Sequence, residues 1–256
     1  MRVLNIGAGP KTTPIPPHYD GWEVVRLDTE AENEPDLLMD AIELDTLEPG
    51  QFDAVYASHL LEHIYPADLE RFMAGVWHVL TDDGLAEFRV PDGLAACKRA
   101  AQAGNLDAFC YQSPAGAITA WDILYGYLPF QKRFGRPMAH HSAYDAGGLG
   151  LVLRAYGFPL VYVSVGHFEL RAVACKGQPD ADTLERMGID DGAGKRGAVH
   201  TDAGAADVDT VRFVRPVAEQ ALRTETGTGV GDSTAQSRAR RDGKNLPRAA
   251  GLGGRL

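Results

Sequence analysis

The sequence predicts an α/β fold with a mostly parallel sheet, helices on both faces and an antiparallel strand at its C-terminal end. The first observation is that short apolar runs, typical of buried strands, alternate with segments of helical periodicity. The second is that the last two apolar runs are separated only by Gly166 and His167, which is hairpin spacing. The last strand is therefore expected to run antiparallel to its neighbours.

Four apolar runs near the start of the chain predict strands, at residues 2–6, 23–27, 36–39 and 52–57. The run at 36–39 gives the weakest signal of the four. Residues 68–80 carry apolar side chains at a spacing of three and four, which predicts an amphipathic helix.

A turn is expected after this helix, because Thr81-Asp82-Asp83-Gly84 combines turn-forming residues. A strand is then predicted at residues 85–90, and Pro91 is expected to end it.

Residues 93–141 interrupt the alternation, and we interpret them as a helical lid inserted into the fold. A helix-like segment occupies residues 94–102, and residues 109–134 hold seven of the chain's 21 aromatic residues. After the lid the pattern resumes with a helix and two strands, at residues 142–156, 160–165 and 168–175.

Apolar clusters become sparse toward the C-terminus, where residues 188–256 include 12 glycines. Such a segment cannot bury enough surface to offset its conformational entropy. We therefore predict one folded domain at residues 1–176 and a disordered tail at 177–256, with one short element near residues 211–222.

Charge and cysteine content restrict the function and the compartment. The formal net charge of −10 lies entirely in residues 1–176, which hold 13 basic and 23 acidic residues, so we expect no tight, sequence-independent nucleic-acid binding. Three cysteines without a C-x-x-C pair predict neither a disulfide framework nor a thiolate metal site, and they favour the cytoplasm. No metal-binding residues are predicted. No apolar run reaches the length of a membrane span, and we expect no secretory signal peptide.

Ligands of open α/β sheets bind beyond the carboxyl ends of the strands, where this sequence places two glycines and two acids. Gly7 and Gly9 follow the first strand and would let the main chain turn sharply beside a ligand. Asp28 ends the second strand 19 residues after Gly9, where a carboxylate can accept hydrogen bonds from ribose hydroxyls. Asp40 follows the third strand and could accept from the amine of an adenine. Together they predict an adenosine-like ligand.

The segment between the first two strands favours S-adenosylmethionine over a dinucleotide. A pyrophosphate needs a helix N-terminus, and the usual fingerprint has a third glycine that is missing here. Prolines at 10, 14, 16 and 17 prevent a regular helix of useful length. A NAD(P)-dependent oxidoreductase is therefore the less favoured alternative.

Three motifs resemble the class I S-adenosylmethionine-dependent methyltransferases, in particular small bacterial members of the methyltransferase-11-like subgroup. They are L-N-I-G-A-G-P at residues 4–10, the strand ending in Asp28, and A-S-H-L-L-E-H at residues 57–63. The match is close over residues 2–92 and looser to Lys176. The resemblance implies a Rossmann-like fold and cofactor contacts at Asn5, Gly7, Ala8, Gly9, Asp28, Asp40, Ala41, Ser58 and His59. Asn5 departs from the many relatives that carry an acidic residue there.

Methyl transfer from a sulfonium is an in-line displacement, so the protein mainly aligns the reactants and excludes water. A catalytic base is optional; the candidates are His59, His140 and His141, because an imidazole can accept a proton near neutral pH. Glu62 and His63 are interpreted as capping or packing residues.

The lid offers candidates for acceptor binding, because aromatic rings can stack on a ring or sugar and arginines can pair with an anionic group. The candidates are Tyr111, Trp121, Tyr125, Arg133 and Arg136. The alternative is that these rings pack the lid onto the sheet. The resemblance favours a small-molecule or glycan acceptor, while a catalytically silent nucleotide-binding partner or regulatory module is the alternative from another class.

Overall fold

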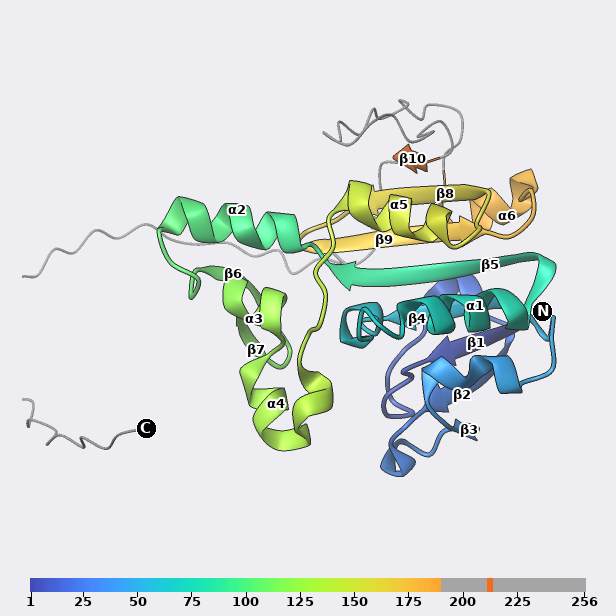
Figure 1. The fold of residues 1–256 in the computed structure, drawn as a ribbon, viewed down its shortest axis with the longest axis horizontal. Coiled ribbons are helices and arrows are strands. Elements are labelled where there is room, and N and C mark those ends of the chain that lie inside the picture. Colours follow the sequence, from blue (N-terminus) through green and yellow to red (C-terminus); the bar gives the residue numbers. More distant parts are fainter. Residues whose placement is uncertain (190–210, 214–256) are drawn as a thin grey trace, which may run out of the picture. The chain divides into compact units, whose positions relative to one another are not determined.

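A computed structural model describes residues 1–189 and 211–213 of the 256-residue chain. Its main sheet has eight strands in the order β10-β8-β9-β5-β4-β1-β2-β3 (Figure 1). Only β9 runs antiparallel to its neighbours, which are β5 and β8. The predicted α/β fold is confirmed. The strand bounds are β1 (Arg2–Ile6), β2 (Glu23–Asp28), β3 (Leu37–Leu38), β4 (Phe52–Ser58), β5 (Leu80–Pro91), β8 (Leu160–Val165), β9 (Glu169–Cys175) and β10 (Val211–Phe213).

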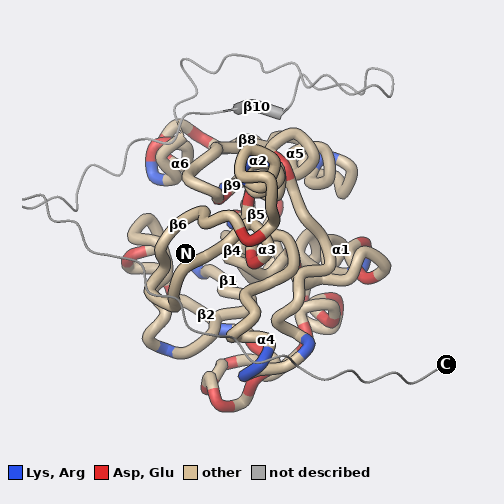
Figure 2. Tube along the Cα trace, turned by 90° about the vertical axis from the view of Figure 1, so that its left-hand side faces the viewer, with Lys and Arg blue, Asp and Glu red and all other residues tan. Residues whose placement is uncertain are grey.

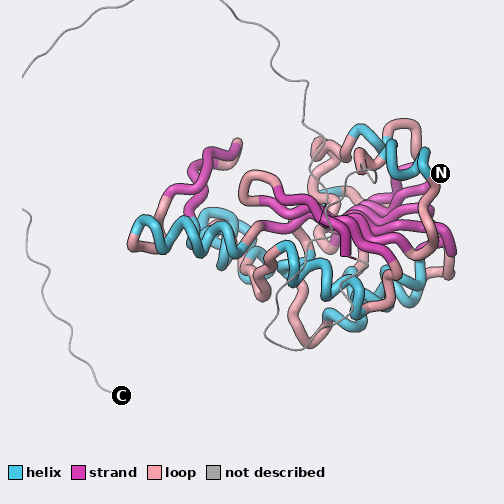
Figure 3. Tube along the Cα trace, turned by 90° about the horizontal axis from the view of Figure 1, so that it is seen from above, coloured by secondary structure: helices cyan, strands magenta, loops and turns pink. Residues whose placement is uncertain are grey.

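Helices cover both faces of the sheet, as predicted (Figure 3). The alternation of side chains along β1 sends Leu4 to one face and Val3 to the other. The Leu4 face packs against α1 (Leu69–Val79) and α5 (Ala146–Ala155). The Val3 face packs against the 3-10 turn η1 (Pro17–Tyr19) and residues next to α6 (Ala181–Arg186).

The first crossover has no α-helix, as the prolines predicted. Only η1 lies between β1 and β2, and Pro17 occupies its first position. Tyr19 anchors this crossover because its ring is buried between Trp22 and Tyr56.

The turn predicted at residues 81–84 is wrong, because these residues lie inside β5, which starts directly after α1. The register between β4 and β5 shifts there, from Phe52 opposite Leu80 to Ala54 opposite Leu85. The turn-forming residues therefore make an irregularity within the strand instead of a connection.

The lid is not purely helical, contrary to the prediction. After α2 (Gly93–Ala103), two short strands pair only with each other in an antiparallel hairpin. They pack with Ala96 and Ile123 in a small apolar cluster of their own. In Figure 1 this segment lies beyond the arrowheads of the parallel strands. Its further elements are β6 (Phe109–Ser113), β7 (Gly116–Thr119), α3 (Ala120–Tyr125), α4 (Leu128–Phe134) and η5 (Arg136–Met138).

The predicted domain boundary at residue 176 is too early. Met187 and Ile189, which follow α6, are 3% and 5% exposed and pack under the sheet. Their pattern is too short to be recognised against the glycine-rich sequence that follows. β10 lies within the short element predicted near residues 211–222. The remainder of the predicted tail lies outside the described residues.

Among the described residues, none of the helices combines the length and the apolar character that a membrane span needs.

Candidate cofactor and acceptor site

The parallel register brings the predicted site residues to one edge of the sheet. Ile6 of β1 lies opposite Leu27 of β2 on one side and opposite Ala57 of β4 on the other. Gly7, Asp28 and Ser58, which follow these three positions, therefore gather at the carboxyl ends of adjacent strands.

The loop after β1 (residues 7–9), called the glycine loop below, has a backbone conformation that requires glycine at two positions. Gly7 and Gly9 have φ angles of +65° and +60°, a region that other residues rarely adopt. The N–H groups of Gly7 and Ala8 donate to the carbonyl of Leu27 at 2.9 and 3.1 Å. A Cβ atom on Gly7 would lie 3.0 Å from Cδ1 of Leu60. The loop therefore passes too close to Leu60 for a larger residue to fit without a shift.

Asp28 fastens the glycine loop to the end of β2. Its carboxylate is nearly buried and accepts from the N–H of Gly9 at 2.8 Å and from the N–H of Glu30 at 2.9 Å. An ionised carboxylate has about four acceptor positions, so each oxygen retains capacity for a ligand hydroxyl. The role of Asp28 in the turn and a role in ribose binding are thus compatible.

Arg26 is a site residue that the sequence analysis missed. Its Nη2 donates to the carbonyls of Ala8 and Gly9 at 3.1 and 2.7 Å. It thereby holds the glycine loop from β2. The signal in the sequence was a single basic residue between the apolar residues Val25 and Leu27.

Asp40 and Ala41, which the resemblance assigns to adenine binding, lie after β3 at the start of a 3-10 helix. Asp40 is exposed, caps η3 (Ala41–Thr46), and accepts from the N–H of Ile42 at 3.0 Å. Ala41 is buried, and so is Asn5, which is 4% exposed within β1.

His59, directly after β4, is held between two carboxylates. Its Nδ1 lies 3.4 Å from Oε1 of Glu62 and its Nε2 lies 3.2 Å from Oε1 of Glu169. Burial lowers the pKa of His59, but the hydrogen bond to Glu169 and the charge of Glu62 outweigh it and raise the pKa to about 10. The ring therefore carries a proton at neutral pH, which argues against its acting as a general base.

The backbone of His59 is strained as well. Its φ angle is +51°, which is uncommon for a residue other than glycine, and its N–H donates to the carbonyl of Arg89 at 2.8 Å. Such conformations persist only where the surrounding structure enforces them, and they cluster at functional sites.

The other two histidines lie at the end of the lid. Nδ1 of His140 is 2.9 Å from the carbonyl of Ile123, and burial lowers the pKa of His140, so the ring is neutral at pH 7. The ring of His141 stacks on Tyr65 at 3.7 Å between centroids. The N–H of His141 donates to the carbonyl of Glu62 at 2.7 Å, which joins the end of the lid to the segment after β4.

The aromatic side chains predicted to bind the acceptor make two separate ring contacts. Tyr111 stacks on Phe168 beside the hairpin of β8 and β9, at 6.0 Å between centroids. Trp121 and Tyr125 contact each other in α3 and remain 43% and 48% exposed. Tyr111 thus packs against Phe168, while the rings of Trp121 and Tyr125 stay accessible.

The two predicted arginines are exposed near the end of the lid. Arg133 lies over the ring of Phe134, with 4.8 Å between its Cζ and the ring centroid. Arg136 begins η5. Figure 2 shows the basic residues of α4 in blue, at the lower end of that view.

Residues 5–88 match the sequence model of a family described as "Methyltransferase domain". No curated protein matches the chain. The solved structures similar to it include a SAM-dependent methyltransferase from Archaeoglobus fulgidus, with 16% identity and a TM-score of 0.45 over 68% of this chain and 85% of that one.

Two further solved structures are similar at comparable levels. A Burkholderia thailandensis 1,6-didemethyltoxoflavin-N1-methyltransferase has 16% identity and a TM-score of 0.44 over 69% of this chain and 71% of that one. A DhpI–SAM–HEP complex has 20% identity and a TM-score of 0.44 over 70% of this chain and 78% of that one.

The family match extends from β1 into β5 and includes the glycine loop, Asp28 and the segment from Ser58 to His63. Residues 5–88 therefore correspond to a methyltransferase domain, and the activity indicated for the chain is S-adenosylmethionine-dependent methyl transfer.

Proposed function

We propose that this methyltransferase acts on a small-molecule or glycan acceptor, and that the glycine loop and Asp28 hold its cofactor. The main support for the proposal is that side-chain hydrogen bonds hold the glycine loop from two sides. Asp28 accepts from the N–H of Gly9, and Arg26 donates to the carbonyls of Ala8 and Gly9. The loop therefore has a defined shape before any ligand arrives, which lowers the entropic cost of binding.

The residues present suit the cofactor. The glycines at positions 7 and 9 add no side chains to the loop, and the free acceptor positions of Asp28 suit ribose hydroxyls. Asp40 and Ala41 offer a carboxylate and an apolar surface for the adenine. When bound, S-adenosylmethionine supplies a methyl group already activated by its sulfonium.

Asn5, Ser58 and His59 would complete the cofactor site. Asn5 keeps hydrogen-bonding capacity but no charge, so it would hold an ammonium group less strongly than a carboxylate would. The protonated ring of His59 suits an anionic or hydroxyl-bearing acceptor better than removal of a proton. The proposed reaction needs no general base, because alignment and exclusion of water can suffice for this electrophile.

The exposed part of the lid is the proposed acceptor surface. Trp121 and Tyr125 present accessible rings, and Arg133 and Arg136, which follow in α4 and η5, are exposed. Stacking on rings combined with a guanidinium suits a sugar or aromatic ring that carries an anionic group.

The cofactor site is tested by substituting Asp28→Asn in the full chain and comparing it with Asp107→Asn, an exposed aspartate of the lid. Asp28→Asn is expected to weaken S-adenosylmethionine binding by about tenfold or more in calorimetry, a loss of about 1.4 kcal/mol. Asp107→Asn is expected to bind as the native chain does. Equal affinities for both variants would remove Asp28 from the site.

A panel of ligands separates the alternatives. S-adenosylmethionine and S-adenosylhomocysteine are expected to raise the melting temperature, whereas NADH and ATP are not. Stabilisation by NADH alone would favour the oxidoreductase alternative. Binding of S-adenosylmethionine without turnover in any acceptor mixture would favour the silent partner module.

A further inference from the structure

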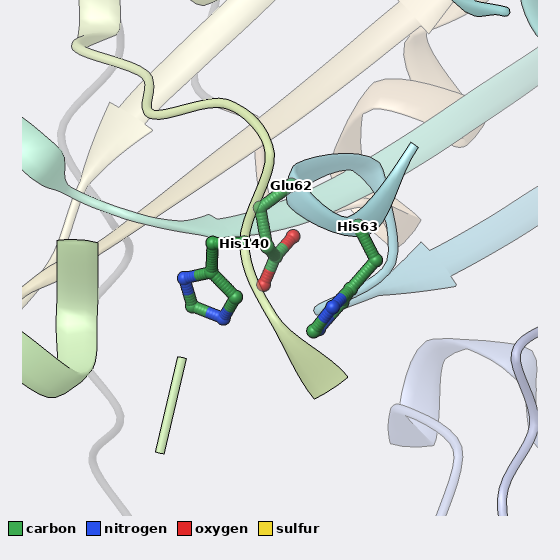
Figure 4. A group of neighbouring side chains, drawn as sticks. All are labelled: Glu62, His63 and His140. Carbon is green, nitrogen blue, oxygen red and sulfur yellow. The ribbon is translucent and has the colours of Figure 1, made fainter. Parts of the chain in front are cut away.

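Glu62 is a buried carboxylate without a hydrogen-bond partner for either side-chain oxygen. The residue is 1% exposed, and its nearest ion-pair contact is Nδ1 of His59 at 3.4 Å. A buried carboxylate is costly unless a charge and hydrogen bonds compensate it. Figure 4 shows this carboxylate between the rings of His63 and His140.

Both of these rings are oriented as metal-binding histidines usually are. Nδ1 of His63 lies 3.0 Å from the carbonyl of Ala139, and Nδ1 of His140 lies 2.9 Å from the carbonyl of Ile123. A carbonyl only accepts hydrogen bonds, so each Nδ1 carries a hydrogen, and in the neutral form of each ring the lone pair is on Nε2. Metal-binding histidines are commonly fixed by such a bond from the second nitrogen.

The three side chains converge on one point. One potential ligand atom from each of Glu62, His63 and His140 lies within 4.8 Å of the other two. Glu62 and His63 belong to η4 (Leu61–His63) after β4, and His140 follows the lid helices. The cluster thus joins the edge of the sheet to the end of the lid.

We propose that Glu62, His63 and His140 bind a divalent transition-metal ion, for which Zn²⁺ is the best match. Two imidazoles and one carboxylate form a ligand set typical of zinc, and three protein ligands leave a position open for water or an acceptor oxygen. Mg²⁺ and Ca²⁺ prefer sites made of oxygen alone. The cysteine pattern argued only against thiolate ligands, so it does not bear on this cluster.

The proposal goes beyond methyl transfer and is tested by binding. The full chain is freed of metal with a chelator and titrated with Zn²⁺ in calorimetry, and Co²⁺ then serves as a spectroscopic probe. We expect one Zn²⁺ per chain and visible absorption bands of protein-bound Co²⁺. Mg²⁺ is expected to compete poorly.

The decisive comparison is His140→Ala against His141→Ala, because the two histidines are adjacent in the chain but only the ring of His140 belongs to the cluster. His141 stacks on Tyr65 instead of joining the cluster. We expect His140→Ala to lose about 100-fold or more in Zn²⁺ affinity, since even outer-shell changes cost up to that much. His141→Ala is expected to bind Zn²⁺ as the native chain does.

Binding of S-adenosylmethionine by the metal-free variants shows that they are folded. Should His140→Ala fail to fold, His63→Gln gives the same comparison. Equal Zn²⁺ affinity in the His140 and His141 variants would overturn the proposal. No saturable binding to the native chain would also overturn it, and Glu62 would then serve only to neutralise His59.

Discussion

At the scale of single residues, two glycines with positive φ angles differ in how much space surrounds them. Gly7 needs a positive φ angle and also space beside Leu60. Gly21 has a φ angle of +82°, but a Cβ atom added there would have nothing within 4 Å. The two glycines therefore share the conformational requirement and differ in the close approach.

Substitution of alanine at these two positions separates the two effects. Gly21→Ala is expected to lower the free energy of unfolding by about 1 kcal/mol, because it forces alanine into a left-handed conformation. Gly7→Ala is expected to cost more than that, because its Cβ atom also meets Leu60. Only Gly7→Ala should also weaken S-adenosylmethionine binding, since only there does the loop have to move. Urea unfolding and calorimetry measure the two quantities, and unchanged binding by Gly7→Ala would contradict the proposed place of the cofactor.

At the scale of elements, β5 holds the helix-free first crossover to the sheet through Glu87. This residue is fully buried and lies 2.7 Å from Nε2 of His18, 3.1 Å from the hydroxyl of Tyr19 and 2.7 Å from Nε of Arg171. Burial raises the pKa of Glu87, but the hydrogen bond to His18 and the charge of Arg171 outweigh it and lower the pKa to about 2. The carboxylate of Glu87 thus links the first crossover, β5 and β9.

Glu87→Gln is expected to lower the free energy of unfolding at pH 7 by about 3 kcal/mol, because it leaves the partly buried guanidinium of Arg171 without its carboxylate partner. Glu23→Gln, which removes an exposed ion pair with Arg2, is expected to cost under about 1 kcal/mol. Equal losses for the two variants in urea unfolding would contradict the role of Glu87.

The same carboxylate predicts a dependence on pH. Because the pKa of Glu87 is lower in the folded chain than in the unfolded chain, its contribution is complete above pH 4.5 and is lost as the pH falls toward 2. The difference in stability between the native chain and Glu87→Gln should therefore shrink over that range. A constant difference would show that Glu87 is not ionised in the folded protein.

At the scale of the whole molecule, the sequence predicts the sheet well because periodicity and strand-ending residues are local signals. The bounds of β1 match the prediction, and β2, β4 and β9 differ by one residue. The lid hairpin is missed because its strands are short and pair only with each other. The end of the domain is missed because α6 is anchored by few apolar side chains.

The site is predicted in part for the same reason. Gly7, Gly9 and Asp28 lie next to strand ends, so their placement follows from the order of the strands. The contact of His63 with Ala139 spans 76 positions and that of His18 with Glu87 spans 69, so no local pattern reveals either.

The central claim is that the glycine loop and Asp28 form the cradle of the cofactor. A crystal structure with S-adenosylhomocysteine tests it most directly. We expect ribose hydroxyls within hydrogen-bond distance of the Asp28 carboxylate and the amino-acid part of the ligand beside Gly7 and Gly9. A nucleoside bound elsewhere, with this edge of the sheet left to solvent, would contradict it.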